Sequence, residues 1–241
     1  MRKNVFTFLS VPVFIILYSF TALIVLICLF FAFLRQRKTV NTVILFWARN
    51  IFRLMAKRLS VTGMENINKK GKYILVANHS SLFDIMAIMS FYPGIAWFGH
   101  ERLMRIPVFS QILRMTNYVP MKAATVANTK KMLENLVANS KGNTIAIFPE
   151  GTRTLNGQIQ DFYRGFIQVL KASEIDVLPV TLNGFFALKP KNRFYINFSS
   201  KISVIIHPPL NKASLVDKSD EEIIQIVKTI IESAYQLKLK A

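Results

Sequence analysis

A histidine and an aspartate five positions apart are the residues of this chain best suited to chemistry. His79 and Asp84 belong to the segment Asn-His-Ser-Ser-Leu-Phe-Asp at residues 78–84, directly after the apolar run 73–77. That run predicts a buried strand that ends in a polar turn. Histidine accepts a proton near neutral pH, and a carboxylate on its second ring nitrogen stabilises the imidazolium. The pattern predicts either a general base for a hydroxyl that the substrate supplies, or a structural hydrogen bond.

A second polar turn follows another short apolar run. Residues 144–148 predict a strand, Pro149 ends it, and Glu-Gly-Thr-Arg follows at residues 150–153. A glycine allows backbone to approach a ligand closely, and the planar fork of an arginine suits a phosphate. Taken alone, these four residues favour a solvated turn.

Together the two segments resemble the glycerolipid acyltransferase family, and within it the bacterial 1-acylglycerol-3-phosphate acyltransferases. Asn78, His79 and Asp84 match the family's Asn-His-x4-Asp pattern, and residues 148–153 match its Phe-Pro-Glu-Gly-Thr-Arg pattern without a gap. Residues 177–180, Val-Leu-Pro-Val, match a further apolar block around a proline. The resemblance covers about residues 60–210.

One block departs from the family pattern. The family usually carries a Gly-x-Ile-x-Val-x-Arg stretch whose arginine helps to hold the substrate phosphate. Residues 117–123 here read Asn-Tyr-Val-Pro-Met-Lys-Ala, so Ala123 stands at the position of that arginine and Lys122 is the nearest cation. A lysine would bind phosphate as a point charge rather than as a fork. This departure leaves glycerol 3-phosphate or another lysophospholipid open as the acceptor.

The resemblance implies transfer of a fatty acyl group from a thioester donor to the sn-2 hydroxyl of 1-acylglycerol 3-phosphate (lysophosphatidic acid), giving phosphatidic acid in phospholipid biosynthesis. It implies that His79 is the general base and that Asp84 orients the imidazole. It assigns substrate binding to Glu150, Gly151, Thr152, Arg153 and, less directly, Lys122. The donor is acyl carrier protein or coenzyme A carrying the acyl group. A hydrolase that adds Ser80 or Ser81 to the pair stays open.

The amino-terminal region predicts a membrane anchor. Residues 4–34 carry no charge, and a helix over them would be about 46 Å long, against about 30 Å for the hydrocarbon core of a bilayer. The apolar core of a signal peptide is shorter, usually about 7–15 residues. We expect residues 1–38 to form the anchor, as a tilted single span or as a hairpin broken near Pro12.

Basic residues follow this apolar run. Arg35 opens the basic stretch, and the first acidic residue is Glu65. The positive-inside tendency places residue 35 onward in the cytoplasm, on the inner face of the cytoplasmic membrane. Arg49, Arg53 and Lys57 recur at i, i+4 and i+8. That spacing predicts a basic amphipathic helix over residues 39–60, either on an anionic leaflet or packed on the catalytic domain.

The charge balance narrows the classes of partner. The formal net charge is +18, from 31 Lys and Arg against 13 Asp and Glu, and 52% of residues are hydrophobic. Such a chain suits nucleic acid or anionic membrane lipids. The apolar anchor favours the membrane, and no nucleic-acid-binding motif is present. We therefore expect no nucleic-acid partner. A non-enzymatic, basic membrane-binding protein remains the alternative from another class.

Residues 61–241 predict a single α/β catalytic domain with a mixed, partly parallel sheet flanked by helices. The candidate strands are 73–77, 95–98, 144–148, 177–182, 194–198 and 202–206, and the candidate helices are 126–137, 166–172 and one that starts at Ser219. Ser219 and Glu222 form the pattern of a capping box. No cofactor or metal site is expected, because Cys28 is the single cysteine and the three histidines are scattered.

Overall fold

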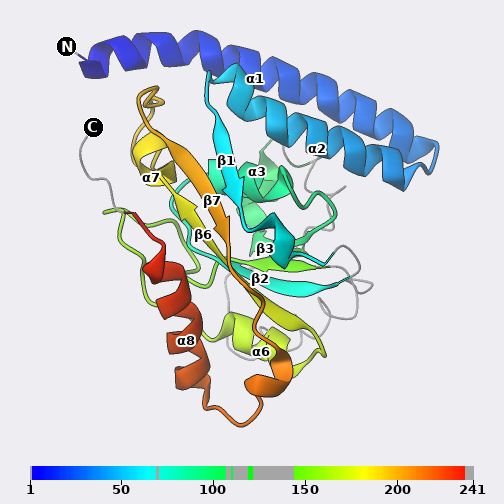
Figure 1. Cartoon of the computed structure of the whole chain (residues 1–241). Helices are drawn as coiled ribbons and strands as arrows, with labels where there is room; N and C mark the ends of the chain where they lie inside the picture. The colour runs from blue at the N-terminus through cyan, green and yellow to red at the C-terminus, as the bar shows by residue number, and fades with distance from the viewer. Residues whose placement is uncertain (1, 69–70, 107–109, 111–118, 122–143, 237–241) are drawn as a thin grey trace.

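A mixed sheet of seven strands forms the centre of the chain (Figure 1). The computed structural model describes residues 2–68, 71–106, 110, 119–121 and 144–236. The strands are β1 (Leu59–Thr62), β2 (Tyr73–Ala77), β3 (Ala96–His100), β4 (Val119–Met121), β5 (Ile145–Ile147), β6 (Asp176–Asn183) and β7 (Ile202–Ile206). Their order is β1-β7-β6-β2-β5-β3-β4. Among these strands all neighbours are parallel except β6 and β7.

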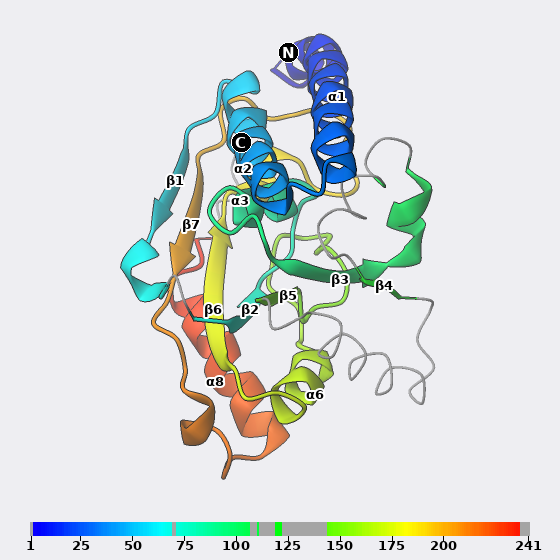
Figure 2. The ribbon, with the colours of Figure 1, turned by 90° about the vertical axis from the view of Figure 1, so that its right-hand side faces the viewer.

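Helices cover both faces of the sheet (Figure 2). The α-helices in the described residues are α1 (Arg2–Phe33), α2 (Arg37–Leu54), α3 (Phe83–Met89), α6 (Gly165–Lys171), α7 (Phe185–Leu188) and α8 (Asp220–Ser233). The short 3-10 turns are η1 (Met64–Asn66), η2 (Glu101–Arg105) and η3 (Lys212–Ser214). Helices α1, α2 and α3 lie on one side of the sheet, and α6 and α8 lie on the other. The predicted α/β fold with a mixed sheet is confirmed.

The central strand β2 divides the core in two. Successive side chains of a strand point to opposite faces of the sheet. Tyr73, Leu75 and Ala77 therefore pack in the cluster beneath α1–α3, while Ile74 and Val76 pack in the cluster with α6 and α8. All five are buried, as expected for a strand covered on both faces. This burial fixes the carboxyl end of β2, where the His79 turn begins.

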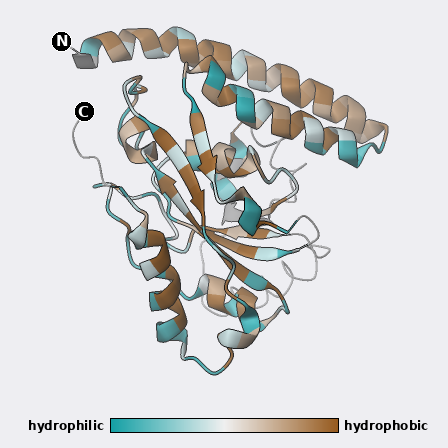
Figure 3. Cartoon of the chain, viewed as in Figure 1, coloured by the Kyte–Doolittle hydropathy of each residue, from teal (hydrophilic) through white to brown (hydrophobic). Residues whose placement is uncertain are grey.

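Helix α1 is continuous through Pro12, so a hairpin broken near that residue is not present. Apolar residues surround the helix (Figure 3). One side packs on the rest of the chain and is buried at Leu17, Ile24 and Cys28. The other side exposes large apolar residues, among them Phe8, Ile15, Ile16, Leu23, Leu26 and Phe30. The helix therefore lies lengthwise against the domain and leaves an apolar face uncovered.

Three strand assignments differ from the sequence prediction. Residues 194–198 were expected to form a strand, but they form a loop whose rings pack on α1, with Phe14 and Phe194 centred 5.3 Å apart. Strands β1 and β4 were not predicted, because each is short and lies at an edge, where Pro120 of β4 is tolerated. Helix α8 begins at Ser219 with the predicted capping box. The helix predicted over residues 126–137 lies outside the described residues.

Candidate active site

The turn after β2 brings His79 and Asp84 into direct contact. Asp84 lies in the first turn of α3, and its Oδ2 atom is 2.9 Å from Nδ1 of His79. The Asp84 side chain is fully buried, while the His79 side chain is 15% exposed. A carboxylate is acceptor-only, so His79 donates through Nδ1. The Nε2 atom is then the ring nitrogen available to accept a proton.

Neighbouring groups fix both members of the pair. Oδ2 of Asp84 also accepts hydrogen bonds from the backbone N–H groups of Ser80 (2.6 Å) and Ser81 (2.8 Å). These donors fix the orientation of the carboxyl group. The imidazole stacks on the ring of Phe148, with centroids 3.9 Å apart and planes 10° apart. Phe148 comes from the second motif, so this stacking joins the two motifs.

Glu150 connects the second motif to the histidine backbone. Its Oε1 atom accepts from the N–H of His79 (2.6 Å), and its Oε2 atom accepts from the N–H of Gln160 (2.9 Å). The residue is 1% exposed. Burial raises the pKa of the Glu150 carboxyl to about 7, against the two backbone donors, which lower it. The carboxyl group is thus occupied by the protein's own backbone and holds the His79 turn in place.

The rest of the second motif lies at the surface of the same turn. Gly151 adopts a φ of +66°, which favours glycine, and both Gly151 and Thr152 are exposed. The N–H of Thr154 donates to the carbonyl of His79 at 3.0 Å. This bond places Arg153, which is half-buried, beside the pair. Burial lowers the pKa of Arg153, and the Asp84 carboxylate partly offsets that change.

Two other predicted positions have different outcomes. Lys122 and Ala123 lie outside the described residues. Lys57 was expected on the basic face of an amphipathic helix, but α2 ends at Leu54. Lys57 is buried instead, and its Nζ donates to the carbonyls of Phe198 and Ser200, the latter at 2.6 Å. That expectation was wrong, because α2 ends before the third basic position of the pattern.

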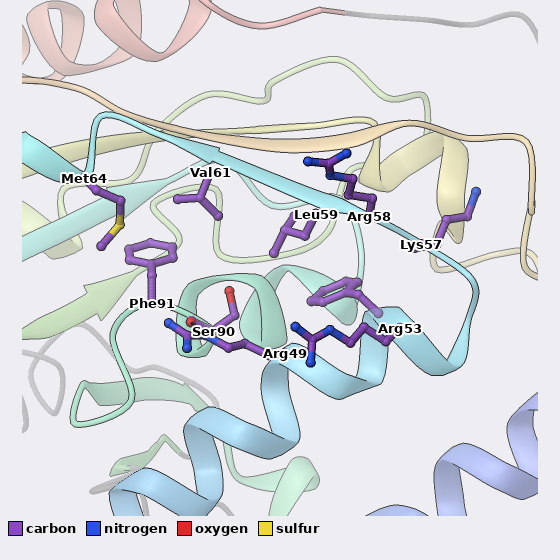
Figure 4. Close-up of a pocket in the computed structure, with 10 residues that line it drawn as sticks. Arg49, Arg53, Lys57, Arg58, Leu59, Val61, Met64, Ser90 and Phe91 are labelled. Atoms are coloured by element: carbon purple, nitrogen blue, oxygen red, sulfur yellow. Dashed lines mark hydrogen bonds between the residues drawn. The ribbon is translucent and has the colours of Figure 1, made fainter.

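A cavity of about 470 Å³ lies apart from the His79 turn, between α2, β1 and the end of α3 (Figure 4). Arg49 and Arg53 reach it from α2, and Leu59 and Val61 line it from β1. The Nε of Arg49 donates to the carbonyl of Ser90, which closes α3, at 2.9 Å. No residue of either motif lines this cavity. We therefore assign the candidate active site to the region around His79 and Arg153, where the two motifs meet.

The structure adds residues that the motifs did not assign. Asn78 exchanges two hydrogen bonds with the backbone of Leu182, at 2.7 and 3.0 Å, and so ties β2 to β6. Lys189 follows α7, and its carbonyl accepts from Oγ of Ser81 at 2.7 Å. Asn78 could have been found from its place in the first motif. Lys189 belongs to none of the motifs and lies more than 100 residues away from Ser81.

The two serines that follow His79 do not bond to its ring, and the Ser81 hydroxyl has other partners. Oγ of Ser81 donates to the Lys189 carbonyl and accepts from the N–H of Phe83 at 3.3 Å. Ser80 is 1% exposed. Within the described part of the chain, neither hydroxyl is hydrogen-bonded to the imidazole. The arrangement favours a base that acts on a hydroxyl brought by the substrate, rather than a serine nucleophile.

Comparison with known proteins agrees with this geometry. Residues 58–183 match the model of the family described as Acyltransferase. A 1-acyl-sn-glycerol-3-phosphate acyltransferase from Borreliella burgdorferi is 31% identical over 182 residues, which cover 71% of this chain and 69% of that protein. The chloroplastic 1-acyl-sn-glycerol-3-phosphate acyltransferase LPAT1 of Arabidopsis thaliana is 28% identical over 159 residues, 64% of this chain. The match spans 44% of the plant protein.

A solved structure resembles the whole chain. The crystal structure of the 1-acyl-sn-glycerophosphate (LPA) acyltransferase PlsC from Thermotoga maritima superposes with a TM-score of 0.83 and 29% identity, over 97% of this chain and 95% of that one. The chain therefore belongs to the acyltransferase family, as its motifs predicted. This membership sets aside a non-enzymatic membrane-binding protein.

Proposed function

We propose that this chain transfers a fatty acyl group from a thioester donor to the sn-2 hydroxyl of 1-acylglycerol 3-phosphate, which gives phosphatidic acid for phospholipid biosynthesis. The observation that carries the proposal is the His79 ring near Arg153, fixed by Asp84 at 2.9 Å and by Phe148, with no hydrogen-bond partner on Nε2 among the described residues. The names of the bacterial relatives support the choice of acceptor.

The mechanism follows from these contacts. Nε2 of His79 removes the proton of the acceptor hydroxyl while the oxygen attacks the thioester carbonyl. Asp84 stabilises the imidazolium that forms. The tetrahedral intermediate then collapses with loss of the thiolate, which takes the proton from the imidazolium, and an ester and a thiol remain. No acyl-enzyme forms.

Arg153, Gly151 and Thr152 lie on the side of the turn where the acceptor's glycerol phosphate would bind. The guanidinium of Arg153 supplies a fork for the phosphate, and the exposed Gly151 leaves room for close approach. Glu150 acts through the backbone of His79 and holds the base in position. The donor is a thioester of acyl carrier protein or of coenzyme A, and both have the carbonyl that the mechanism requires.

The membrane-facing part of the proposal rests on α1 and α2. Within the described residues, α1 contains the one stretch, Asn4–Phe33, that is long and apolar enough to cross a bilayer. Its lengthwise packing on the domain (Figures 1 and 2) supports a position in one leaflet, with the uncovered apolar face in lipid. Arg49 and Arg53 of α2, both exposed, would then meet anionic headgroups.

We assign residues 1–38 to the anchor, 39–60 to the interfacial segment and 61–241 to the catalytic domain, on the cytoplasmic face of the inner membrane. Flotation with liposomes tests this assignment. The full chain is expected to float with anionic vesicles and to float less when Arg49 and Arg53 are both changed to Gln. Equal flotation with neutral vesicles would contradict the electrostatic part.

The acceptor is tested by a panel assay. Purified chain in detergent micelles receives labelled acyl carrier protein thioester or acyl-coenzyme A, together with 1-acylglycerol 3-phosphate, glycerol 3-phosphate or lysophosphatidylethanolamine. We expect phosphatidate as the dominant product. Product from glycerol 3-phosphate or from the neutral-headgroup lysolipid alone would overturn the acceptor assignment. It would also turn Ala123, at the position of the family's arginine, into the leading determinant of specificity.

A further inference from the structure

The backbone of Lys189 is tied to the His79–Asp84 turn. Its carbonyl accepts from Oγ of Ser81 at 2.7 Å, and its N–H donates to the carbonyl of Phe185 at 3.0 Å, at the end of α7. Ser81 also donates its N–H to Asp84. One residue therefore contacts both the buried carboxylate and the Lys189 main chain. The Ser81 bond holds the lysine beside the turn, and the Thr154–His79 bond holds Arg153 beside the same turn.

The cations of this region are crowded and only half-exposed. Burial lowers the pKa of Lys189, and the neighbouring guanidinium groups of Arg153 and Arg193 lower it further. Within the described residues, neither Lys189 nor Arg153 forms an ion pair with a carboxylate. Like charges held together away from water repel each other, and a bound anion would offset that cost.

Arg193 already has a structural role. Its Nη2 donates to the carbonyls of Ala187 and Leu188, and its guanidinium stacks over Tyr195 at 4.7 Å from the ring centre. Lys189 is different, because among the described residues its Nζ makes one hydrogen bond, to the carbonyl of Arg193 at 2.9 Å. An ammonium group has three donors. Two of them remain for a ligand while that bond keeps the side chain in place.

We propose that Lys189 is the second cation of the acceptor's phosphate site and binds the phosphate monoester together with Arg153. This inference rests on the proposed function and names a residue outside the family match, which ends at residue 183. A phosphate monoester carries up to two negative charges and three terminal oxygens, which suits one fork and one point charge beside the base. Lys189 thus supplies positive charge that Ala123 does not.

The test compares Lys189→Met with Lys191→Met. Methionine keeps the length and apolar stem of lysine but removes the charge, and Lys191 is an exposed lysine two residues further on. Lys189→Met is expected to raise the KM for 1-acylglycerol 3-phosphate about 10- to 100-fold, the usual range for a hydrogen bond to a charged group. The kcat should change less than about threefold. Lys191→Met should leave both constants unchanged, and Lys189→Arg should restore most of the affinity.

A second acceptor separates binding from folding. With 1-acylglycerol, which lacks the phosphate, wild type and Lys189→Met should react at equal rates. If Lys189→Met lowers kcat with an unchanged KM, or affects both acceptors alike, the lysine is structural and the proposal is overturned. Equilibrium binding of labelled 1-acylglycerol 3-phosphate without a donor tests the phosphate site separately from the proposed acyl transfer. Weaker binding by Lys189→Met supports the site even if wild type forms no phosphatidate, whereas equal binding by both proteins rejects it.

Discussion

The turn that carries His79 and Asp84 and the turn that carries Lys189 are built in different ways. The first is local in sequence: the base and its carboxylate lie five residues apart, the carboxylate accepts from two backbone N–H groups of the same turn, and the imidazole donates to the carboxylate. The second depends on distant contacts, with Ser81 on one side and α1 on the other, where Oγ of Ser10 accepts from the N–H of Ile196 at 2.8 Å. In the proposed function, proton transfer thus depends on a short motif, and phosphate binding depends on the tertiary fold.

Helix α1 contacts the loop that follows Lys189 and is thereby connected to the candidate site. The rings of Phe6 and Phe14 on α1 lie 6.2 and 5.3 Å from those of Tyr195 and Phe194. The same loop follows the Lys189 turn. Helix α1 is therefore part of the support of the basic turn as well as an apolar surface. We expect changes in the local turn to act on kcat and changes in the distant contacts to act on KM.

The largest effect is expected at Asp84. Asp84→Asn removes the negative charge that stabilises the imidazolium, although an amide oxygen can still accept from the three donors that converge on Oδ2. We expect kcat to fall about 10³-fold or more with a small change in KM. Initial rates with saturating acceptor measure this, with the unfolding midpoint as the control for folding. A kcat within tenfold of wild type would show that Asp84 is only structural.

The next effect concerns stability and pH at Glu150. Burial raises the pKa of the Glu150 carboxyl from its ordinary value of 4.5 to about 7, so the folded chain keeps this group protonated up to about pH 7. Between those pH values the folded state binds more protons than the unfolded state, so the free energy of unfolding falls as pH rises. The fall attributable to Glu150 is at most about 3 kcal/mol, at 1.36 kcal/mol per pH unit.

Denaturant unfolding at pH 4.5, 6 and 7.5 measures that slope. The Glu150→Gln variant is expected to be less stable, because its amide NH₂ faces a backbone donor. Its stability should nevertheless vary less with pH in this window. Parallel pH profiles for the two proteins would show that Glu150 keeps its ordinary pKa.

A smaller effect is expected at Arg153. Arg153→Lys keeps the charge and loses the planar fork. The KM for 1-acylglycerol 3-phosphate should rise about tenfold, more than kcat falls. The matched control is Arg164→Lys, at an exposed arginine that pairs with Glu221 on the surface. An unchanged KM in Arg153→Lys would argue that Arg153 supports the turn and does not contact the phosphate.

The smallest effect is expected at the contact between α1 and the loop. Ser10→Ala leaves the buried N–H of Ile196 without its acceptor and should cost about 1–2 kcal/mol of stability. The KM for the acceptor should rise about two- to fivefold through the Lys189 turn. Thr42→Ala, which removes an exposed helix hydroxyl of α2, is the control. A loss of kcat without a change in KM would contradict the coupling of α1 to the phosphate side.

Local patterns predicted much of the sheet and the His79 turn. The run 73–77 is β2 as predicted, and the capping box at Ser219 begins α8, because strand burial and helix capping depend on residues close in sequence. The pair His79 and Asp84 also meets within one turn. Their role in catalysis stays a prediction until it is measured.

Other features depend on tertiary contacts that sequence periodicity does not report. Residues 194–198 have the composition of a strand, yet their rings find partners on α1 instead of in the sheet. Lys57 continues a basic helical pattern, yet it lies beyond the helix and satisfies two loop carbonyls. Lys189 belongs to none of the motifs. Its place beside the His79 turn follows from the hydrogen bond between Ser81 and its carbonyl, which joins residues distant in the sequence.

The most direct test of the central claim is acyl transfer by His79→Ala with and without added imidazole. Phosphatidate formed from a labelled thioester and 1-acylglycerol 3-phosphate is measured in micelles for both proteins. Wild type should form the product, and the variant should lose about 10²- to 10⁴-fold in rate and regain part of it with imidazole. A variant that stays folded and keeps the wild-type rate would contradict His79 as the general base.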